Sequence, residues 1–291
     1  LRGKQWNLFT NTGWRYRANP GNAFNDSQFF STNAQNARVI EDRTFGRLGR
    51  SLFTSFGAEY YISKNSSLIG NIIINKGNDD DTNTNIIGRF DALGNVNEST
   101  LRIEDESEDE NRIQYTLDYI HNFDGNGKKL SINFQYSSKL EDILNNITET
   151  DTQLNLLNDL EQVIENQDEN RGLLQIDYIH PVGEKIQYEA GYRGNYRNIY
   201  NQFFLAERQD FPDGPLVPDA GLNNAFDYRE LINAMYFQYG QEFGKVSLLL
   251  GLRFELTAIE IEQETLDSSD KKSYENLFPT FNFGYKFKDD Q

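Results

Sequence analysis

The chain has 291 residues, a net charge of −17 and only 37% hydrophobic residues, and nowhere do 18 apolar residues run together. A membrane protein built from helices is therefore excluded, because a spanning helix needs roughly 20 consecutive apolar residues. The negative charge argues against a nucleic-acid partner, whose phosphates demand Lys and Arg. The absence of cysteine excludes disulfides and thiolate metal sites.

Alternation of apolar and polar residues recurs along the whole chain and predicts β-strands, in which successive side chains point to opposite faces. Aromatic residues make up 13% of the chain, as two belts of rings at membrane interfaces would require. The twelve predicted strands cover residues 4–17, 46–62, 66–76, 84–91, 96–104, 111–122, 128–139, 170–180, 184–203, 226–242, 245–262 and 273–287.

The connections between these strands alternate between short and long. Short turns of Gly, Asn, Asp, Pro or Ser, which accept turn dihedrals, are predicted at 63–65, 92–95, 123–127, 181–183 and 243–244. Long polar loops are predicted at 18–45, 77–83, 105–110, 140–169, 204–225 and 263–272. Outer-membrane barrels show this asymmetry, so we expect the short turns on one side of the membrane and the extracellular loops on the other.

Two of the predicted loops are acidic. The segment 104–110 carries carboxylates at six of its seven positions. It predicts a solvated loop kept open by charge repulsion rather than a divalent-cation site, because the regular spacing of a calcium loop is missing. In the loop 140–169, the spacing of Leu154, Leu157, Leu160 and Ile164 predicts a short amphipathic helix.

The clearest hairpin lies at 234–260, around the turn at Gly244. Its arms approach twice the usual length of about 5–6 residues for a soluble strand and suit a transmembrane strand of roughly 9–11 residues. The predicted fold is all-β, a transmembrane antiparallel up-and-down β-barrel. The residues expected to face lipid are Trp6, Leu8, Trp14, Leu117, Tyr119, Ile132, Phe134, Tyr136, Ile176, Tyr178, Tyr188, Tyr192, Leu248, Leu250, Leu252 and Phe254.

The two histidines, His121 and His180, each end an Asp-Tyr-Ile-His segment before a short turn. On second-neighbour strands they would lie about 10 Å apart, too far for one zinc ion. No rigid carboxylate pair or nucleophile arrangement is recognisable elsewhere. We therefore expect no metal site, no cofactor and no enzymatic activity.

Charged residues on the polar faces of the strands are the better functional candidates. They are expected to face the lumen, either as ion pairs that satisfy a wet interior or as contacts with a solute or a plug. The candidates for ligand binding are Glu189, Arg193, Arg197, Arg253 and Glu255, with Glu59, Asp118 and Asp177 on other strands.

Four segments resemble the outer-membrane β-barrel family of TonB-dependent receptors: 6–19, 57–63, 235–257 and the Leu-Phe-Pro-containing stretch 274–285. The resemblance implies a location in the bacterial outer membrane, contact with its lipid, and uptake of a small solute. It also implies a plug domain inside a 22-stranded barrel and an energising complex in the inner membrane.

This chain shows no plug and about twelve strands. Residues 1–291 are therefore expected to be part of one larger barrel domain, the barrel portion of a receptor that takes up a nutrient or chelate. Two alternatives remain: a surface or adhesive barrel that transports nothing, and a soluble all-β carbohydrate-binding module.

Overall fold

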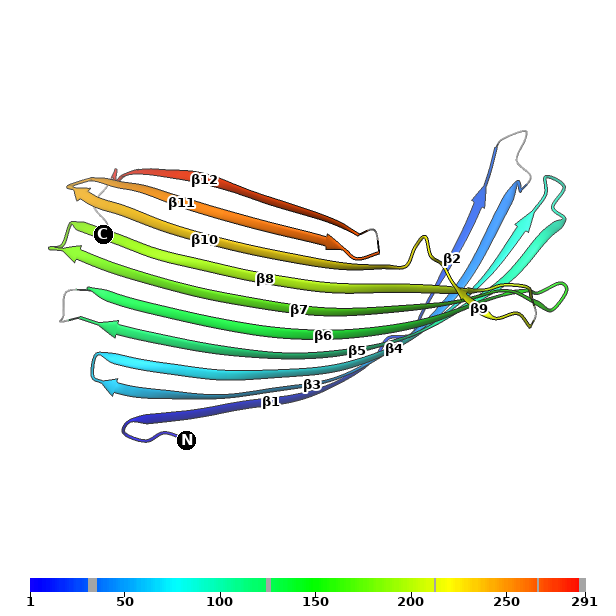
Figure 1. Cartoon of the computed structure of the whole chain (residues 1–291), viewed down its shortest axis with the longest axis horizontal. Coiled ribbons are helices and arrows are strands. Elements are labelled where there is room, and N and C mark those ends of the chain that lie inside the picture. Colours follow the sequence, from blue (N-terminus) through cyan, green and yellow to red (C-terminus); the bar gives the residue numbers. More distant parts are fainter. Residues whose placement is uncertain (31–35, 124–126, 212, 266, 288–291) are drawn as a thin grey trace.

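The computed structural model describes residues 1–30, 36–123, 127–211, 213–265 and 267–287, and all its strands belong to one antiparallel sheet (Figure 1). The all-β fold predicted from the alternation is confirmed. No helix among these residues is long and apolar enough to cross a membrane.

The sheet has twelve strands, and ten of them follow one another in the order β1-β3-β4-β5-β6-β7-β8-β10-β11-β12. Two shorter strands lie off this path, β2 pairing with β3 and β9 with β8. The strands are β1 Trp6–Ala18, β2 Gly21–Gln28, β3 Arg38–Ser63, β4 Ser66–Phe90, β5 Val96–Asn122, β6 Lys129–Asp151, β7 Leu156–Val182, β8 Ile186–Arg208, β9 Leu216–Pro218, β10 Asn224–Phe243, β11 Val246–Gln263 and β12 Ser268–Tyr285.

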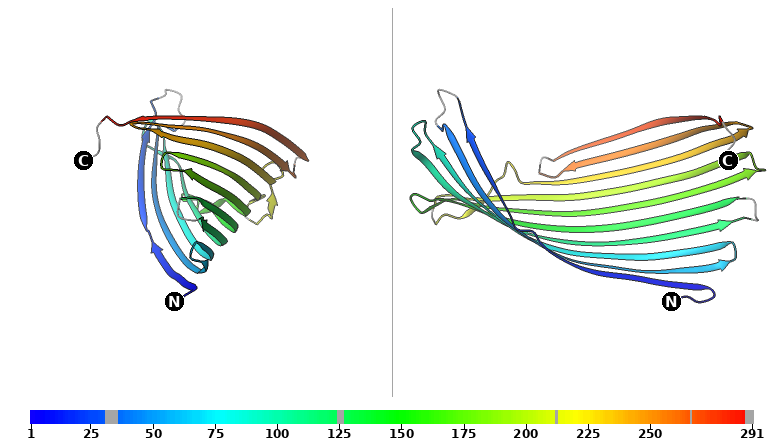
Figure 2. Two further views of the ribbon diagram at one scale, coloured as in Figure 1. Left: turned by 90° about the vertical axis from the view of Figure 1, so that its left-hand side faces the viewer. Right: turned by 180° about the vertical axis from the view of Figure 1, so that it is seen from behind.

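The sheet is a single layer that curls into a trough (Figure 2). Its longest strands, β5 and β7, have 27 residues each, which corresponds to roughly 90 Å of extended chain. No second layer covers either face, so the buried hydrophobic residues in the described part are only Ile147, Leu205, Ala206, Ala225 and Ala234. The chain is therefore a wall whose two faces both meet solvent or lipid.

Cross-strand pairing keeps each side chain on a constant face from β1 to β12. Leu117 pairs with Phe134 and Phe134 with Leu174, whereas Asp118 pairs with Asn133 on the opposite face. We call the face that carries Phe134 and Leu250 the outer face, and the face that carries Asp177 and Arg193 the inner face. A slip of one residue in any pair would exchange the two faces, so the alternation fixes the register.

The inner face is the concave one, because its side chains converge. The Tyr236 hydroxyl of β10 reaches across β8 and donates a hydrogen bond of 2.5 Å to Asp177 of β7. The ring passes over Gly191, where a Cβ atom would lie 2.3 Å from the Tyr236 ring. Large outer-face side chains are instead widely exposed, among them Phe134, Leu250 and Leu252.

The long connections predicted at 77–83 and 105–110 are wrong, because both segments are continuous strand. The predicted strands 66–76 and 84–91 are one strand, β4, and 96–104 and 111–122 are one strand, β5. Asp79 to Asp81 pair residue by residue with Glu106 to Glu108. Polar residues do not end these strands, because this part of the sheet needs no apolar face.

The long loop and the helix predicted within 140–169 are also wrong. β6 continues to Asp151, a turn follows, and β7 begins at Leu156. Leu160 and Ile164 lie in β7 and pair with Thr148 and Leu144. Likewise, β2 and part of β3 occupy the predicted loop 18–45, β9 lies within 204–225, and β12 begins inside 263–272.

The strand directions place the turns at two ends. The short connections after β3, β5, β7 and β10 lie together at one end, which we call the turn end (left in Figure 1). Gly244 adopts a φ of +61° there, a conformation that glycine favours. Residues 124–126 of the turn predicted at 123–127 lie outside the described residues. The turn at 92–95 follows β4 and lies at the opposite end, which corrects the prediction that all five short turns share one side.

Candidate functional site

The outer face carries an apolar band along the half of the sheet nearer the turn end. On β8 it runs from Tyr188 to Tyr196, and on β11 from Leu248 to Leu256. About nine residues per strand suit a tilted crossing of the bilayer core. Beyond the band, a row of paired residues turns polar: Ser138, Asn170, Asn198, Arg229, Glu260 and Lys271.

Aromatic rings border this band, as amphipathic rings do at membrane interfaces. The Trp6 and Tyr60 rings lie near the turn end with centroids 4.4 Å apart, and Tyr178, Tyr188 and Tyr239 lie towards the same end of their strands. Tyr115, Tyr136 and Tyr196 lie towards the other border. All sixteen residues predicted to face lipid share the outer face.

The five candidate ligand-binding residues all lie on the inner face, but the structure does not bring them together. Arg253 and Glu255 form an ion pair of 2.8 Å with each other on β11. Glu189, nearer the turn end of β8, accepts a hydrogen bond of 2.5 Å from Gln187. Only Arg193 and Arg197 line the same cavity.

That cavity contains a third arginine, Arg171 of β7, which pairs directly opposite Arg197 of β8. Two guanidinium groups lie side by side here because one carboxylate holds both. The Arg171 and Arg197 Nε atoms donate to the same oxygen, Glu169 Oε1, at 2.8 and 2.7 Å. The Glu169 side chain is only 9% exposed, whereas those of Arg171 and Arg197 are 57% and 41% exposed.

Glu169 is ionised despite its burial. Burial raises the pKa of its carboxyl group, but hydrogen bonds and charges from Arg171 and Arg197 outweigh this and bring the pKa below its ordinary value. The carboxylate therefore fixes the two arginines at neutral pH while most of their ten N–H donors remain free to bind something else.

Arg193 is the remaining arginine of this cavity and lies on β8 four residues before Arg197, nearer the turn end. Its Nε atom donates to Asn195 Oδ1 at 3.4 Å. No carboxylate lies within ion-pair distance of Arg193 in the described part of the chain. We call Arg171, Arg193 and Arg197 the arginine pocket; the cavity that they line measures about 550 Å³ and also contains Gln114, Gln135, Asn195 and Glu230.

The sequence prediction named two of these arginines and missed Arg171. Alternation alone could have identified Arg171. It lies six residues before Asp177 on the predicted strand 170–180 and therefore shares its face, and Asp177 is expected to face the lumen. Glu169, the partner of Arg171, falls within the predicted loop 140–169, so the sequence pattern assigns it to neither face of a strand.

An acidic wall lies further from the turn end on the same inner face. Glu104, Glu106, Glu108 and Glu110 alternate along β5, and candidate ligand oxygens of Glu108, Glu110 and Glu141 lie within 4.8 Å of one another. The Lys139 ammonium supplies a positive charge among them, 3.3 Å from Glu110 and 2.7 Å from Glu141. Burial, a hydrogen bond with Glu141 and nearby carboxylates raise the pKa of Glu108 to about 7.

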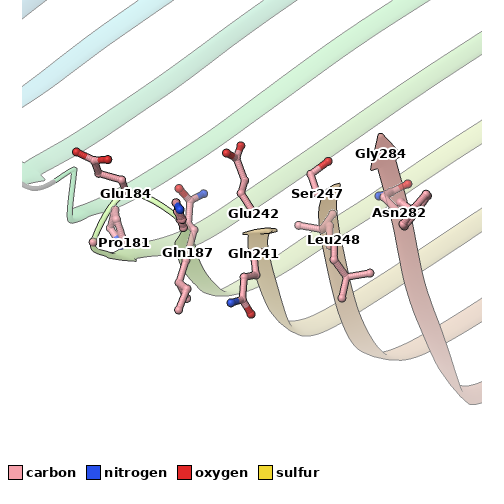
Figure 3. A pocket seen from close by; sticks show the side chains of 15 residues that line it. Pro181, Glu184, Gln187, Gln241, Glu242, Ser247, Leu248, Asn282 and Gly284 are labelled. Atoms are coloured by element: carbon pink, nitrogen blue, oxygen red, sulfur yellow. The ribbon is translucent and has the colours of Figure 1, made fainter. Parts of the chain in front are cut away.

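Another hollow of about 490 Å³ lies at the turn end and is lined by residues from the ends of β7, β8, β10, β11 and β12; Figure 3 shows its lining side chains. Gln187, Ser247 and Asn282 come from the inner face, and Gln241 and Leu248 from the outer face. This hollow is therefore the rim of the sheet rather than a site on one face, and its polar groups do not converge.

The histidines lie as the sequence predicted, on β5 and β7 with β6 between them. The Nδ1 atom of His121 lies 2.5 Å from Ser66 Oγ, and that of His180 lies 3.1 Å from the Tyr178 hydroxyl. Each imidazole ring therefore forms a hydrogen bond with a neighbouring side chain at the turn end.

A family model described as "Outer membrane protein beta-barrel family" matches residues 121–291. A search of curated proteins finds no significant match. Among solved structures, the unliganded ferric citrate transporter FecA is similar at 13% identity and a TM-score of 0.45, over 96% of this chain and 43% of that one. The chain thus spans less than half the length of that transporter.

Two further solved structures are similar. The outer membrane protease OmpT from Escherichia coli has 7% identity and a TM-score of 0.33, over 98% of this chain and 97% of that one. The translocator domain of the autotransporter NalP from Neisseria meningitidis has 9% identity and a TM-score of 0.23, over 98% and 90%.

Proposed function

The chain belongs to the outer membrane protein β-barrel family and is a protein of the bacterial outer membrane; from this premise, we propose that it forms part of the wall of a receptor barrel that takes up a nutrient or chelate. The proposed receptor is of the TonB-dependent type, with a plug and an inner-membrane energising complex as partners. It binds and passes a solute, and catalyses no reaction.

The observation that carries this proposal is the contrast between the two faces. An apolar band bordered by aromatic rings covers the outer face, while the inner face carries charges and amides along every long strand. A purely structural barrel needs only a satisfied interior. The arginine pocket goes further, since it presents exposed guanidinium groups in an open cavity of about 550 Å³.

The proposal of a larger barrel is supported by the unpaired edges of the sheet. In the described residues, β1 pairs only with β3 and β12 only with β11, so the sheet is open. Lipid does not tolerate unpaired backbone N–H and C=O groups. We propose that further strands pair with both edges and enclose a lumen wide enough for a plug.

The soluble carbohydrate-binding alternative is wrong, because the family is one of outer-membrane barrels. A surface or adhesive barrel remains the second candidate. The strands favour it in one respect: β4 to β8 extend well beyond the apolar band and form a tall polar rim.

Uptake is tested by deleting the gene from its host and comparing solutes consumed from a defined medium by mass spectrometry. The receptor proposal predicts that at least one solute is consumed more slowly by the deletion strain, and that the full-length gene restores its uptake. A protonophore that collapses the inner-membrane gradient should abolish the restored uptake. Equal consumption of all solutes, together with a loss of surface attachment, would instead establish the adhesive barrel.

A further inference from the structure

We propose that the arginine pocket binds an oxyanion group, a carboxylate or a phosphate, of the solute that passes along the inner face. The inference rests on the proposed function for the solute's route, but the site itself stands on the geometry of Arg171, Arg193 and Arg197. It names the chemical class of solute, which neither the fold nor the family supplies.

The local charge opposes the charge of the whole molecule. The chain carries a net charge of −17, yet three arginines line this cavity, against two carboxylates: Glu230, which also lines it, and Glu169, which pairs with Arg171 and Arg197. Arg193 has no carboxylate within ion-pair distance in the described part of the chain. A cavity of net positive charge in an acidic protein concentrates anions.

The donors are also held in place before a ligand arrives. Glu169 Oε1 accepts from both Arg171 and Arg197, so these guanidinium groups need little reordering when an anion binds. Arg193 is held less firmly, by a hydrogen bond of 3.4 Å from its Nε atom to Asn195 Oδ1. Fixing flexible side chains in advance reduces the entropic cost of binding.

The chemistry of the donors selects planar or tetrahedral oxyanions. A guanidinium group donates two parallel hydrogen bonds that match the oxygens of a carboxylate or a phosphate. The amides of Gln114 and Gln135 line the same cavity and offer donors beside the charges. A single anionic group thus finds several donors within one cavity on β5 to β8.

The test is isothermal titration calorimetry on the full-length protein, purified in detergent, with citrate, inorganic phosphate and glucose as probes. We expect citrate or phosphate to bind with an affinity that falls as salt rises, and glucose not to bind. The two anions distinguish a carboxylate solute from a phosphate solute. Arg193→Gln should weaken binding at least tenfold, and Arg193→Lys should weaken it less.

Arg229→Gln is the matched control, because Arg229 pairs with Asn198, next to Arg197, but lies on the outer face. It should leave the affinity unchanged. Heat-dependent mobility on denaturing gels shows whether each variant forms a folded barrel; if Arg193→Gln does not fold, Arg197→Gln replaces it. Absence of anion binding at millimolar concentration, or equal losses in Arg193→Gln and Arg229→Gln, would overturn the proposal.

The outcomes separate this inference from the proposed function. Uptake of a neutral solute without anion binding would refute the arginine pocket and leave the receptor standing. Anion binding without uptake of any solute would refute the receptor and leave the pocket standing.

Discussion

On the inner face, a single carboxylate can hold several charged side chains in place, and Glu169 is the clearest case. It is nearly buried, and its one oxygen holds two arginines. Arg171 and Arg197 are each about half exposed, so the ion pairs themselves are partly screened by solvent. Replacing Glu169 should nevertheless destabilise the protein more than replacing either arginine, since both guanidinium groups then lose a charged hydrogen bond.

We expect Glu169→Gln to lower the free energy of unfolding by about 1.5–3 kcal/mol, the usual contribution of a hydrogen bond to a charged group. Because the folded pKa of Glu169 is lowered, its stabilisation is present above pH 4.5, its ordinary value, and is lost as pH falls through the folded pKa. Urea unfolding in lipid at pH 7 and pH 3 measures both effects. An equal loss at the two pH values would contradict the ionised clamp.

Glu108 behaves in the opposite way. Its pKa of about 7 lies above its ordinary value of 4.5, so the folded protein retains a proton that the unfolded chain has lost. Its contribution is therefore fully present below pH 4.5 and disappears as pH rises to about 7. The carboxylates of Asp79 and Glu141 face it from the neighbouring strands, and the Lys139 ammonium opposes them.

Glu108→Gln should accordingly flatten the pH dependence of stability between pH 4.5 and 7, relative to the unaltered protein. Equilibrium unfolding at several pH values in that window checks this. Glu104→Gln, on the same face of β5, is the comparison: burial raises the pKa of Glu104, but hydrogen bonds from Arg102 and Asn83 outweigh this and lower it, so its removal should leave the slope in this window unchanged. An undiminished slope in Glu108→Gln would show that the proton resides elsewhere.

Single strands show what could be predicted from the sequence. Within the apolar band, alternation of Leu248, Leu250 and Leu252 with polar neighbours settles which face each side chain takes. Beyond the band both faces are wet, so alternation disappears and acidic strands such as 104–110 look like loops. The ion pair between Glu169 and Arg197 is not predictable from the sequence for that reason, because neighbours on adjacent strands follow only once the strand ends are known.

The two faces of β11 provide a direct comparison of adjacent residues. Leu250→Arg places a charge in the apolar band and should cost about 2–4 kcal/mol near the bilayer midplane. Leu249→Arg is the matched change, since Leu249 lies on the inner face and its arginine can meet water. Refolding into lipid vesicles under urea measures both. Equal losses in the two variants would contradict the assignment of faces.

The turn at 92–95 tests strand direction. It lies at the end opposite the turn that contains Lys64, so a cysteine placed at Leu93 should react with a membrane-impermeant maleimide on intact cells. A cysteine at Lys64 should react only after the outer membrane is permeabilised. The reverse pattern would invert the topology, and labelling of both positions on intact cells would exclude it.

At the scale of the whole molecule, the described residues form one curved wall without a core of their own. Its stability in the membrane depends on lipid against the outer face, water against the inner face, and paired strands at both edges. The amino-acid alternation predicted the first two conditions. The third, further strands paired with both edges, belongs to the proposed barrel, and no local pattern in the sequence specifies it.

The central claim is that the bilayer contacts the outer face and water contacts the inner face. Spin labels placed one at a time at residues 247–256 of β11, in the full-length protein in lipid vesicles, test it directly. Collision rates with oxygen should peak at even positions, including Leu250 and Leu252, and those with a water-soluble nickel chelate at odd positions, including Gly251 and Arg253. Equal access of the nickel chelate to both sets would contradict a membrane wall.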